Sequence, residues 1–237
     1  ITRGEKKSAW AAFLGYLDTH KHKLQKGRLE KAKVGEGVAQ GGHFEKLRWA
    51  RANGCPWYED TCYWAVMNGH FEMLQWARAN GCPWDKYTCC GAASWGHLEM
   101  LQWARANGCP WNEDTCNLAA KCGHLEVLQW LRANSRKWDR KACSGAARGG
   151  HLEILQLLRA NGCPWDAVTC SGAAAGGQHE LLQWLRTNGC PWDMWTTFHA
   201  GLKGHLEVLK WAHANECPMD TNSFCESAAQ SENLVVM

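Results

Sequence analysis

A unit of 27 residues recurs along this chain without insertion, and it constrains the fold more than any other feature. Gly-Cys-Pro-Trp starts at residue 54, and the same register gives further repeat starts near 81, 108, 135, 162, 189 and 216. A Gly-His pair recurs at the same interval, with Gly-Gln in one unit. A period of this length is typical of a solenoid, in which each unit packs on the next.

Each unit predicts two short helices, as residues 81–107 illustrate. Asp85 is a good N-cap for a first helix that continues to the break at Gly96-His97. A second helix is expected from Leu98 to Asn107, where Gly108 supplies a left-handed terminating residue. No alternating run is long enough for a strand, so the expected fold class is all-α. Because one helix pair cannot bury its own apolar face, stability must come from stacking on neighbouring units.

The pattern resembles the ankyrin repeat. The matching stretches are Thr-x-x-x-Ala-Ala (88–93, 115–120 and 169–174), Gly-His-Leu-Glu-Val-Leu (123–128) and the closing Leu-x-x-Asn-Gly (158–162). Cys replaces the Pro of the family's Thr-Pro-Leu-His motif at Cys62, Cys89, Cys116, Cys143 and Cys170. The resemblance covers about residues 36–237 and implies a right-handed solenoid of stacked helix-turn-helix repeats.

The repeat departs from the ankyrin pattern in length. The standard ankyrin unit has 33 residues, and this unit is six shorter. The gap falls between Cys-Pro-Trp-Asp and the Thr, where the family has its β-turn finger. The chain is therefore identified as carrying finger-shortened ankyrin repeats, and contacts made by family fingertips are not carried over to it.

Fourteen cysteines would indicate disulfides in a short secreted chain, but here they follow the repeat. Identical positions in stacked repeats lie about 8–10 Å apart, whereas a disulfide needs Cα atoms within about 7 Å. We therefore expect buried free thiols in a reducing intracellular compartment. The cytoplasm is the first expectation, and a processed organelle protein is the alternative.

Two tryptophan positions and one arginine position recur through the array. A residue present in every unit serves what every unit needs, so we expect the tryptophans to pack. The arginine that recurs in the repeat, such as Arg105, is expected to lie in solvent on the outer face. The tryptophans are Trp57, Trp84, Trp111, Trp138, Trp165 and Trp192 in the links, and Trp49, Trp76, Trp103, Trp130, Trp184 and Trp211 on the second helices.

The first helices combine a constant stripe with a variable face. Thr and Cys at 61–62 and Ala at 65 recur as core, while residues at the register of 59, 60, 63, 64, 67 and 68 change between units. In a stack the variable positions line up, and ankyrin-like folds present them on the concave side. The expected partner-binding residues are Tyr63, Trp64, Met67, Tyr87, Trp95, Lys121, Arg148, Met194, Trp195, Phe198, His199 and Leu202.

Small residues separate the large side chains of this face. Ser144, Gly145, Ser171, Gly172 and Ala175 predict a shallow middle between two aromatic ends. Aromatic anchors beside a shallow groove suit a protein partner. The alternative for some of these residues, Trp64 and Phe198 above all, is packing between repeats.

Residues 1–35 do not fit the repeat and are expected to form a helical cap or a docking segment. Residues 1–33 carry nine Lys and Arg against three acidic residues. This basic arm favours an anionic partner, with a solvated cap helix as the alternative. The run 6–24 also weakly resembles the first helix of an HMG-box DNA-binding module. The basic-arm candidates are Lys6, Lys7, Lys21, Lys23, Lys26 and Arg28.

Nothing in the repeat predicts an enzyme. Cys55, Cys62 and His70 recur as a set, but structural zinc takes four ligands and usually a tighter Cys spacing. Catalysis requires one singular, polarised site, and several equal Cys-His copies do not provide it. The glycine-rich run 35–42 lacks a preceding strand and a Lys-Ser/Thr, so it is not expected to bind phosphate. We expect no metal site and no cofactor, and the repeated His is expected to cap or bridge helices.

The sequence therefore predicts a non-catalytic scaffold or adaptor that binds another protein through its first helices. The alternative is a structural subunit of a large complex, held by the basic N-terminal segment. Nucleic-acid binding through that arm is a third, weaker hypothesis. No apolar run approaches the roughly 18 residues of a membrane helix, so no span is expected. We also expect no homo-oligomer.

Overall fold

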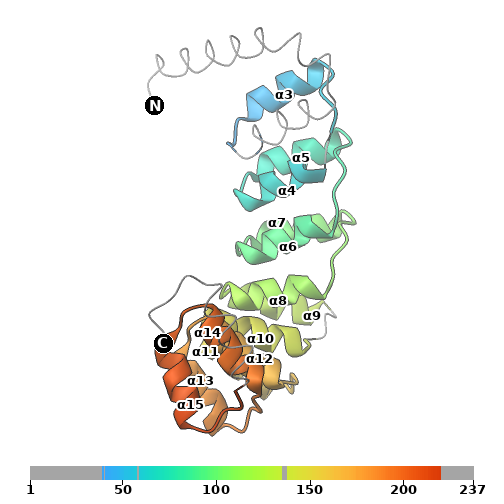
Figure 1. Cartoon of the computed structure of the whole chain (residues 1–237). Helices are drawn as coiled ribbons and strands as arrows, with labels where there is room; N and C mark the ends of the chain where they lie inside the picture. Colours follow the sequence, from blue (N-terminus) through green and yellow to red (C-terminus); the bar gives the residue numbers. More distant parts are fainter. Residues whose placement is uncertain (1–38, 40, 58, 135–137, 220–237) are drawn as a thin grey trace, which may run out of the picture. The chain divides into compact units, whose positions relative to one another are not determined.

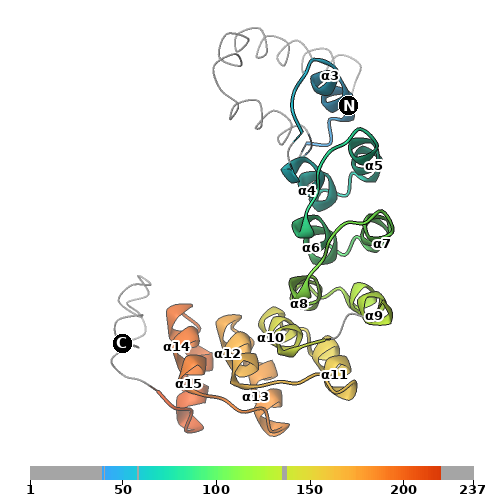
Figure 2. The same cartoon turned by 90° about the vertical axis from the view of Figure 1, so that its right-hand side faces the viewer.

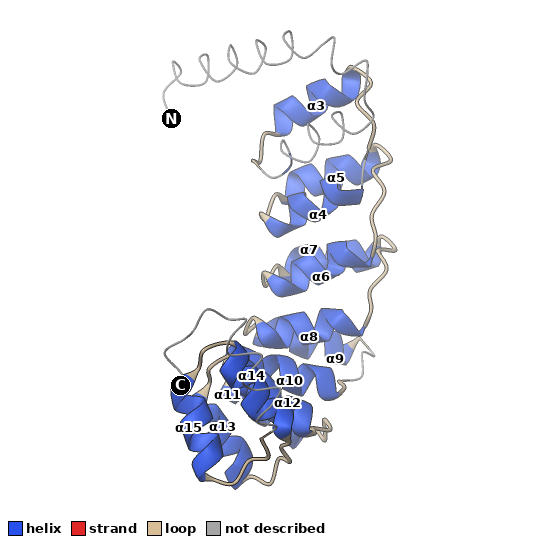
Figure 3. Ribbon diagram, in the orientation of Figure 1, coloured by secondary structure: helices blue, strands red, loops and turns tan. Residues whose placement is uncertain are grey.

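A computed structural model describes residues 39, 41–57, 59–134 and 138–219. The chain divides into two compact units, one ending at Trp84 and the other beginning at Asp85. Every regular element in these described residues is a helix, as the expected all-α fold class requires (Figure 3). The expected cap at residues 1–35 lies outside the described residues.

The first unit contains one helix and one complete helix pair among its described residues. The helices are α3 (Phe44–Ala52), α4 (Glu59–Met67) and α5 (Phe71–Ala79). Leu47, Leu74 and Ala77 are buried, and the rings of Phe44 and Trp76 meet edge to face at 5.6 Å between centroids. The stacking of successive helices on shared apolar faces therefore begins in this unit.

The described residues of the second unit form five helix pairs in register (Figure 1). Its first helices are α6 (Lys86–Ser94), α8 (Glu113–Lys121), α10 (Arg140–Gly149), α12 (Ala167–Ala175) and α14 (Met194–Leu202). Its second helices are α7 (Leu98–Ala106), α9 (Leu125–Ala133), α11 (Leu152–Ala160), α13 (His179–Thr187) and α15 (Leu206–Ala214). Figure 2 shows α10, α12 and α14 in one row and α11, α13 and α15 in a second row.

The predicted start and stop signals act as expected. Asp85 accepts a hydrogen bond from the Tyr87 backbone N–H at 2.9 Å, so it caps α6. Asn107 donates its side-chain amide to the Trp103 carbonyl at 2.8 Å, and Gly108 follows in the left-handed region at φ 81°. These residues end α7 and turn the chain into the extended link.

The core runs along the facing stripes of the two helix rows. Leu101, Leu128, Leu155 and Leu182 occupy one repeat position, and each is completely buried. Threonine and cysteine at the start of the constant stripe are buried as well, as Thr115 shows. The array therefore derives its stability from the interfaces between repeats.

Candidate binding face of the first helices

The exposed large apolar side chains are concentrated on the first helices. Six such side chains are exposed among the described residues, and only Leu152 of α11 lies on a second helix. The other five are Tyr87, Trp95, Val168, Met194 and Trp195, which lie on first helices or at a first-helix C-cap. Val168 was missed by the sequence analysis, although it shares its repeat register with Tyr87 and Trp195.

The middle of the first-helix face is closed by packing, and the predicted shallow groove is wrong there. Gly145 and Gly172 are buried. A Cβ on Gly145 would lie 2.6 Å from the Asn117 carbonyl oxygen, and one on Gly172 would lie 2.8 Å from that of Ser144. These residues are small because neighbouring first helices approach each other closely, so the exposed surface is left at the two ends of each helix.

At the N-terminal edge of this face, charged side chains pair with one another. Lys141 lies 3.5 Å from the carboxylate of Glu113 and 3.8 Å from that of Asp114. Arg140 lies 3.2 Å from Asp166. Their neighbours on α12 and α14 are instead apolar, so this edge combines a charge-balanced stretch with an exposed apolar patch.

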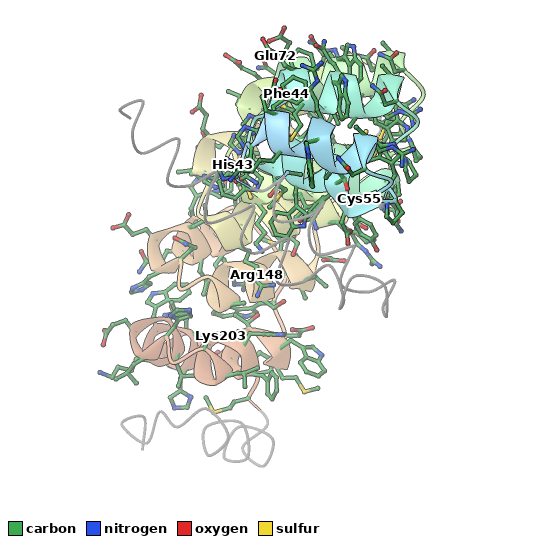
Figure 4. All side chains as sticks on the ribbon, turned by 90° about the horizontal axis from the view of Figure 1, so that it is seen from above. His43, Phe44, Cys55, Glu72, Arg148 and Lys203 are labelled. Atoms are coloured by element: carbon green, nitrogen blue, oxygen red, sulfur yellow. The ribbon has the colours of Figure 1, made fainter. Side chains whose placement is uncertain are left out.

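At the C-terminal edge the exposed cations have no acidic partner. Lys121, Arg148 and Lys203 form no ion pair within the described part of the chain. Figure 4 labels Arg148 of α10 and Lys203, the C-cap residue that follows α14. Trp95 lies at the same end of α6 and is 55 % exposed. This edge therefore offers an aromatic side chain and positive charge to a partner.

The aromatic side chains of α14 form a small cluster. The Trp195 ring lies 5.3 Å from Phe198 and 6.0 Å from His199, and His199 Nδ1 lies 2.8 Å from the Trp195 carbonyl oxygen. Phe198 holds the register at which Ser171 is buried between first helices. Trp195 holds the register of Val168, which is 53 % exposed with helices on both sides. Trp195 is therefore the stronger candidate for contact with a partner.

The remaining predicted residues are less accessible. Tyr63, Trp64 and Met67 lie on α4 of the first unit and are half-buried, with the Tyr63 and Trp64 rings 5.5 Å apart. Leu202 near the end of α14 is also half-buried. The basic-arm lysines and Arg28 lie outside the described residues.

The recurrent tryptophans pack as predicted, but the repeat arginine does more than solvate the surface. The rings of Trp111 and Trp130 meet edge to face, with 5.8 Å between their centroids. The guanidinium carbon of Arg105 lies 4.2 Å from the centroid of the Trp111 ring. Arg105 also donates a hydrogen bond to the Cys109 carbonyl. The arginine therefore ties its helix to the following link through a cation–π contact and a charged hydrogen bond.

The repeated histidine bridges helices and does not cap its own. His97, His124 and His151 stand at N-cap positions without a side-chain capping bond. His124 Nε2 instead lies 2.9 Å from the Ser94 carbonyl oxygen at the end of the preceding first helix. His151 makes the same contact with the Lys121 carbonyl at 3.0 Å. The bridging half of the prediction is therefore confirmed and the capping half is wrong.

Comparisons with known proteins identify these units. Residues 89–132, from α6 to α9, match the family model described as ankyrin repeats (many copies). Residues 89–132 carry ankyrin repeats. Among solved structures, 217 chains are similar to this one. The ankyrin repeat domain of human ASB11 matches with a TM-score of 0.52 and 16 % identity over 66 % of this chain and 84 % of that chain. The search of curated proteins gives no match.

The described residues contain neither a membrane-spanning helix nor a group of three or more side chains placed to bind a metal ion. None of the helices there is long and apolar enough to cross a bilayer. No three His, Cys, Asp or Glu side chains converge there as a set of metal ligands. Ankyrin repeats generally mediate protein–protein interactions.

Proposed function

We propose that this chain is a non-catalytic scaffold or adaptor that binds a partner protein through the first-helix face of its second unit. The observation that carries the proposal is the segregation of exposed large apolar side chains: of the six in the described part of the chain, five lie on first helices or at a first-helix cap. Exposure of these apolar side chains to water is unfavourable in free energy. Val168, Met194 and Trp195 lie on the neighbouring helices α12 and α14, and an exposed apolar patch of this kind marks an interaction surface.

The chemistry of the face supports a protein as the partner. Trp195 is 48 % exposed and Tyr87 is 56 % exposed, and buried aromatic anchors dominate the binding energy of protein interfaces. Lys121 and Arg148, which form no ion pair with the residues described, lie at the opposite edge of the same helix row. The face therefore offers apolar contact area together with charges that favour one orientation of the partner.

Affinity capture from the native source tests this proposal. Wild type is compared with Tyr87→Ala and with Trp195→Ala, and captured proteins are quantified by mass spectrometry. Leu152→Ala is the matched control, because Leu152 is 37 % exposed but lies on α11. We expect both first-helix variants to lose a partner that the control retains. Equal retention by all variants, or loss in the control alone, would contradict the proposal.

The alternative role as a structural subunit depends on residues 1–33, outside the described residues. It predicts that deletion of these residues abolishes association and that association weakens steeply with salt. A partner that is lost from Trp195→Ala and kept by the deletion variant supports the first proposal.

A further inference from the structure

One exposed aromatic position recurs on two first helices of the second unit. Tyr87 of α6 and Trp195 of α14 share the same repeat register, and both are exposed. In each repeat the N-cap aspartate accepts a hydrogen bond from the backbone N–H of the aromatic residue, at 2.9 Å for Asp85 and 3.1 Å for Asp193. Each ring therefore stands two residues after a capping carboxylate, at the N-terminal edge of the first-helix face.

In α6 a cation of the same helix lies over the aromatic ring. Lys86 Nζ is 5.3 Å from the centroid of the Tyr87 ring, a distance at which a positive group is attracted to the face of an aromatic ring. The repeat of α6 therefore supplies its own cation to the exposed ring, and the contact shows that a positive group can lie there.

In α14 the corresponding ring has no such cation. Met194 occupies the register of Lys86, and no cation–π contact within the described part of the chain involves Trp195. Phe198 and His199 pack against part of the indole, yet Trp195 is 48 % exposed. Tryptophan binds cations more strongly than tyrosine does, so the better ring is the one that is left open.

The fixed charges at this end of α12 and α14 are acidic. Neither helix contains Asp, Glu, Lys or Arg, and their N-cap residues are Asp166 and Asp193. Asp166 pairs with Arg140 at 3.2 Å, whereas Asp193 forms no ion pair with the residues described. Arg186, the arginine of the same repeat, lies over the Trp192 ring instead. A cation of a partner therefore meets a carboxylate that no other charge balances.

We propose that Asp193 and Trp195 together bind an arginine side chain of the partner protein. The guanidinium lies over the indole, as Lys86 lies over its ring, and donates hydrogen bonds to the carboxylate of Asp193. An apolar side chain of the same partner segment packs on Val168 and Met194, which are exposed beside the site. This inference rests on the proposed function, since it names the chemistry of the segment that the first-helix face binds.

Two arguments favour arginine over lysine as the partner's cation. Guanidinium groups lie over six tryptophan rings in the described residues, as Arg78 and Arg159 do at 4.1 Å from the ring centroid. A guanidinium is also planar and less strongly hydrated than an ammonium group. It can therefore stack on an indole and donate to a carboxylate at the same time.

Peptide selection on the intact chain tests the proposal. A phage-displayed library of short random peptides is selected on wild type and, in parallel, on Trp195→Ala. We expect wild type to enrich arginine next to an apolar residue, and Trp195→Ala to lose that enrichment. Enrichment that depends on Trp195 but lacks arginine would overturn this inference and leave the proposed function standing. The absence of any enrichment that depends on Trp195 would also overturn it. The proposed function fails separately, when the affinity capture described above shows equal retention by all variants.

Synthetic versions of one selected peptide test the charge on unaltered protein, so this arm does not depend on how well variants fold. Citrulline has the shape of arginine without the positive charge. Its substitution for arginine is expected to raise the Kd about tenfold, and lysine is expected to raise it about threefold. Calorimetry measures each Kd. Equal Kd values for the arginine and citrulline peptides, or tighter binding of the lysine peptide, would overturn the proposal.

A charge-removing variant tests the carboxylate. Asp193→Asn keeps a residue type that caps helices well but removes the charge, and we expect the Kd of the arginine peptide to rise about fivefold. Asp139→Asn is the matched control, because Asp139 caps α10 by accepting from the Lys141 backbone N–H. This control is expected to bind as wild type does. An unchanged Kd for Asp193→Asn, or an equal rise in both variants, would overturn the role of Asp193.

A second variant supplies the missing cation from the chain itself. Met194→Lys places a lysine at the register that Lys86 holds in α6, so it is expected to compete for the Trp195 ring and raise the peptide Kd about tenfold. Ala167→Lys adds the same charge at that register of α12, where the next residue is Val168 and no ring is present. It is expected to have a smaller effect. Equal effects of the two lysine variants would show general repulsion and overturn the proposal.

Discussion

The two helices of each repeat follow different rules. Second helices are nearly copies of one another, with Glu as the second residue and Leu as the fourth in each one described. First helices change at their outer positions from unit to unit. Among the residues that the structure describes, only one of the six exposed large apolar side chains lies on a second helix. Uniform positions serve stacking, which every unit needs, and variable exposed positions are free to serve a partner. Four substitutions test this division.

The largest effect is expected in the core of the second helices, at a leucine that recurs from repeat to repeat. Leu155 of α11 is completely buried, so Leu155→Ala removes apolar contact and leaves a cavity. We expect the free energy of unfolding to fall by about 2–5 kcal/mol. Urea denaturation followed by circular dichroism measures it, and a loss below about 1 kcal/mol would show that this interface is loosely packed.

The exposed first-helix face should show the opposite behaviour. Trp195→Ala is expected to change the unfolding free energy by less than about 0.5 kcal/mol, because the side chain is half in solvent. Binding of the captured partner should weaken by about 2 kcal/mol, roughly a 30-fold higher Kd. A titration by calorimetry measures the Kd. Loss of stability equal to that of the Leu155 variant would assign Trp195 to the core instead.

The turn between the two helices is expected to tolerate little change. Gly96 has φ 71°, and a Cβ there would lie 2.5 Å from Nδ1 of His124, the residue that bridges to Ser94. Gly96→Ala should therefore cost about 1–3 kcal/mol through backbone strain and displacement of the imidazole. Thermal unfolding measures this cost. Gly108→Ala is the control, because it shares the positive φ but has open space around a Cβ.

The smallest effect is expected for the paired charges of the N-terminal edge. Lys141 is exposed, and so are its partners Glu113 and Asp114 in large part. Lys141→Ala should change the unfolding free energy by less than about 1 kcal/mol, and less still at high salt. Urea denaturation at two salt concentrations checks this. A larger, salt-insensitive loss would show that Lys141 contributes packing to the interface between α8 and α10.

Most of the fold could be predicted from the sequence, because it depends on interactions between residues that lie close together in the chain. Asp85 as a cap, Gly108 as a left-handed terminator and the constant Thr-Cys-Ala stripe each act within a few residues, so the repeat pattern is enough to place them. The burial of Gly145 and Gly172 could not be read in this way. It depends on how closely neighbouring first helices approach, and a small residue is compatible with both a groove and a tight contact.

The role of Arg105 and the contact of the Cys89 thiol with the Cys109 carbonyl were missed for a related reason. Each contact joins a helix to the link segment of the following repeat. The number of residues that separates the two partners is set by how the repeats stack. One signal was present in the sequence. Cys89 and Cys109 recur together at a constant separation, and the repeat that lacks the link cysteine keeps its helix cysteine as Cys116.

Hydrogen–deuterium exchange of the complex with the captured partner tests the central claim most directly. The account predicts that protection on binding falls on α6, α8, α10, α12 and α14, at the ends that carry Trp95 and Trp195, while α7, α9, α11, α13 and α15 exchange as in the free protein. Protection confined to the second helices, with the first helices unchanged, would contradict it.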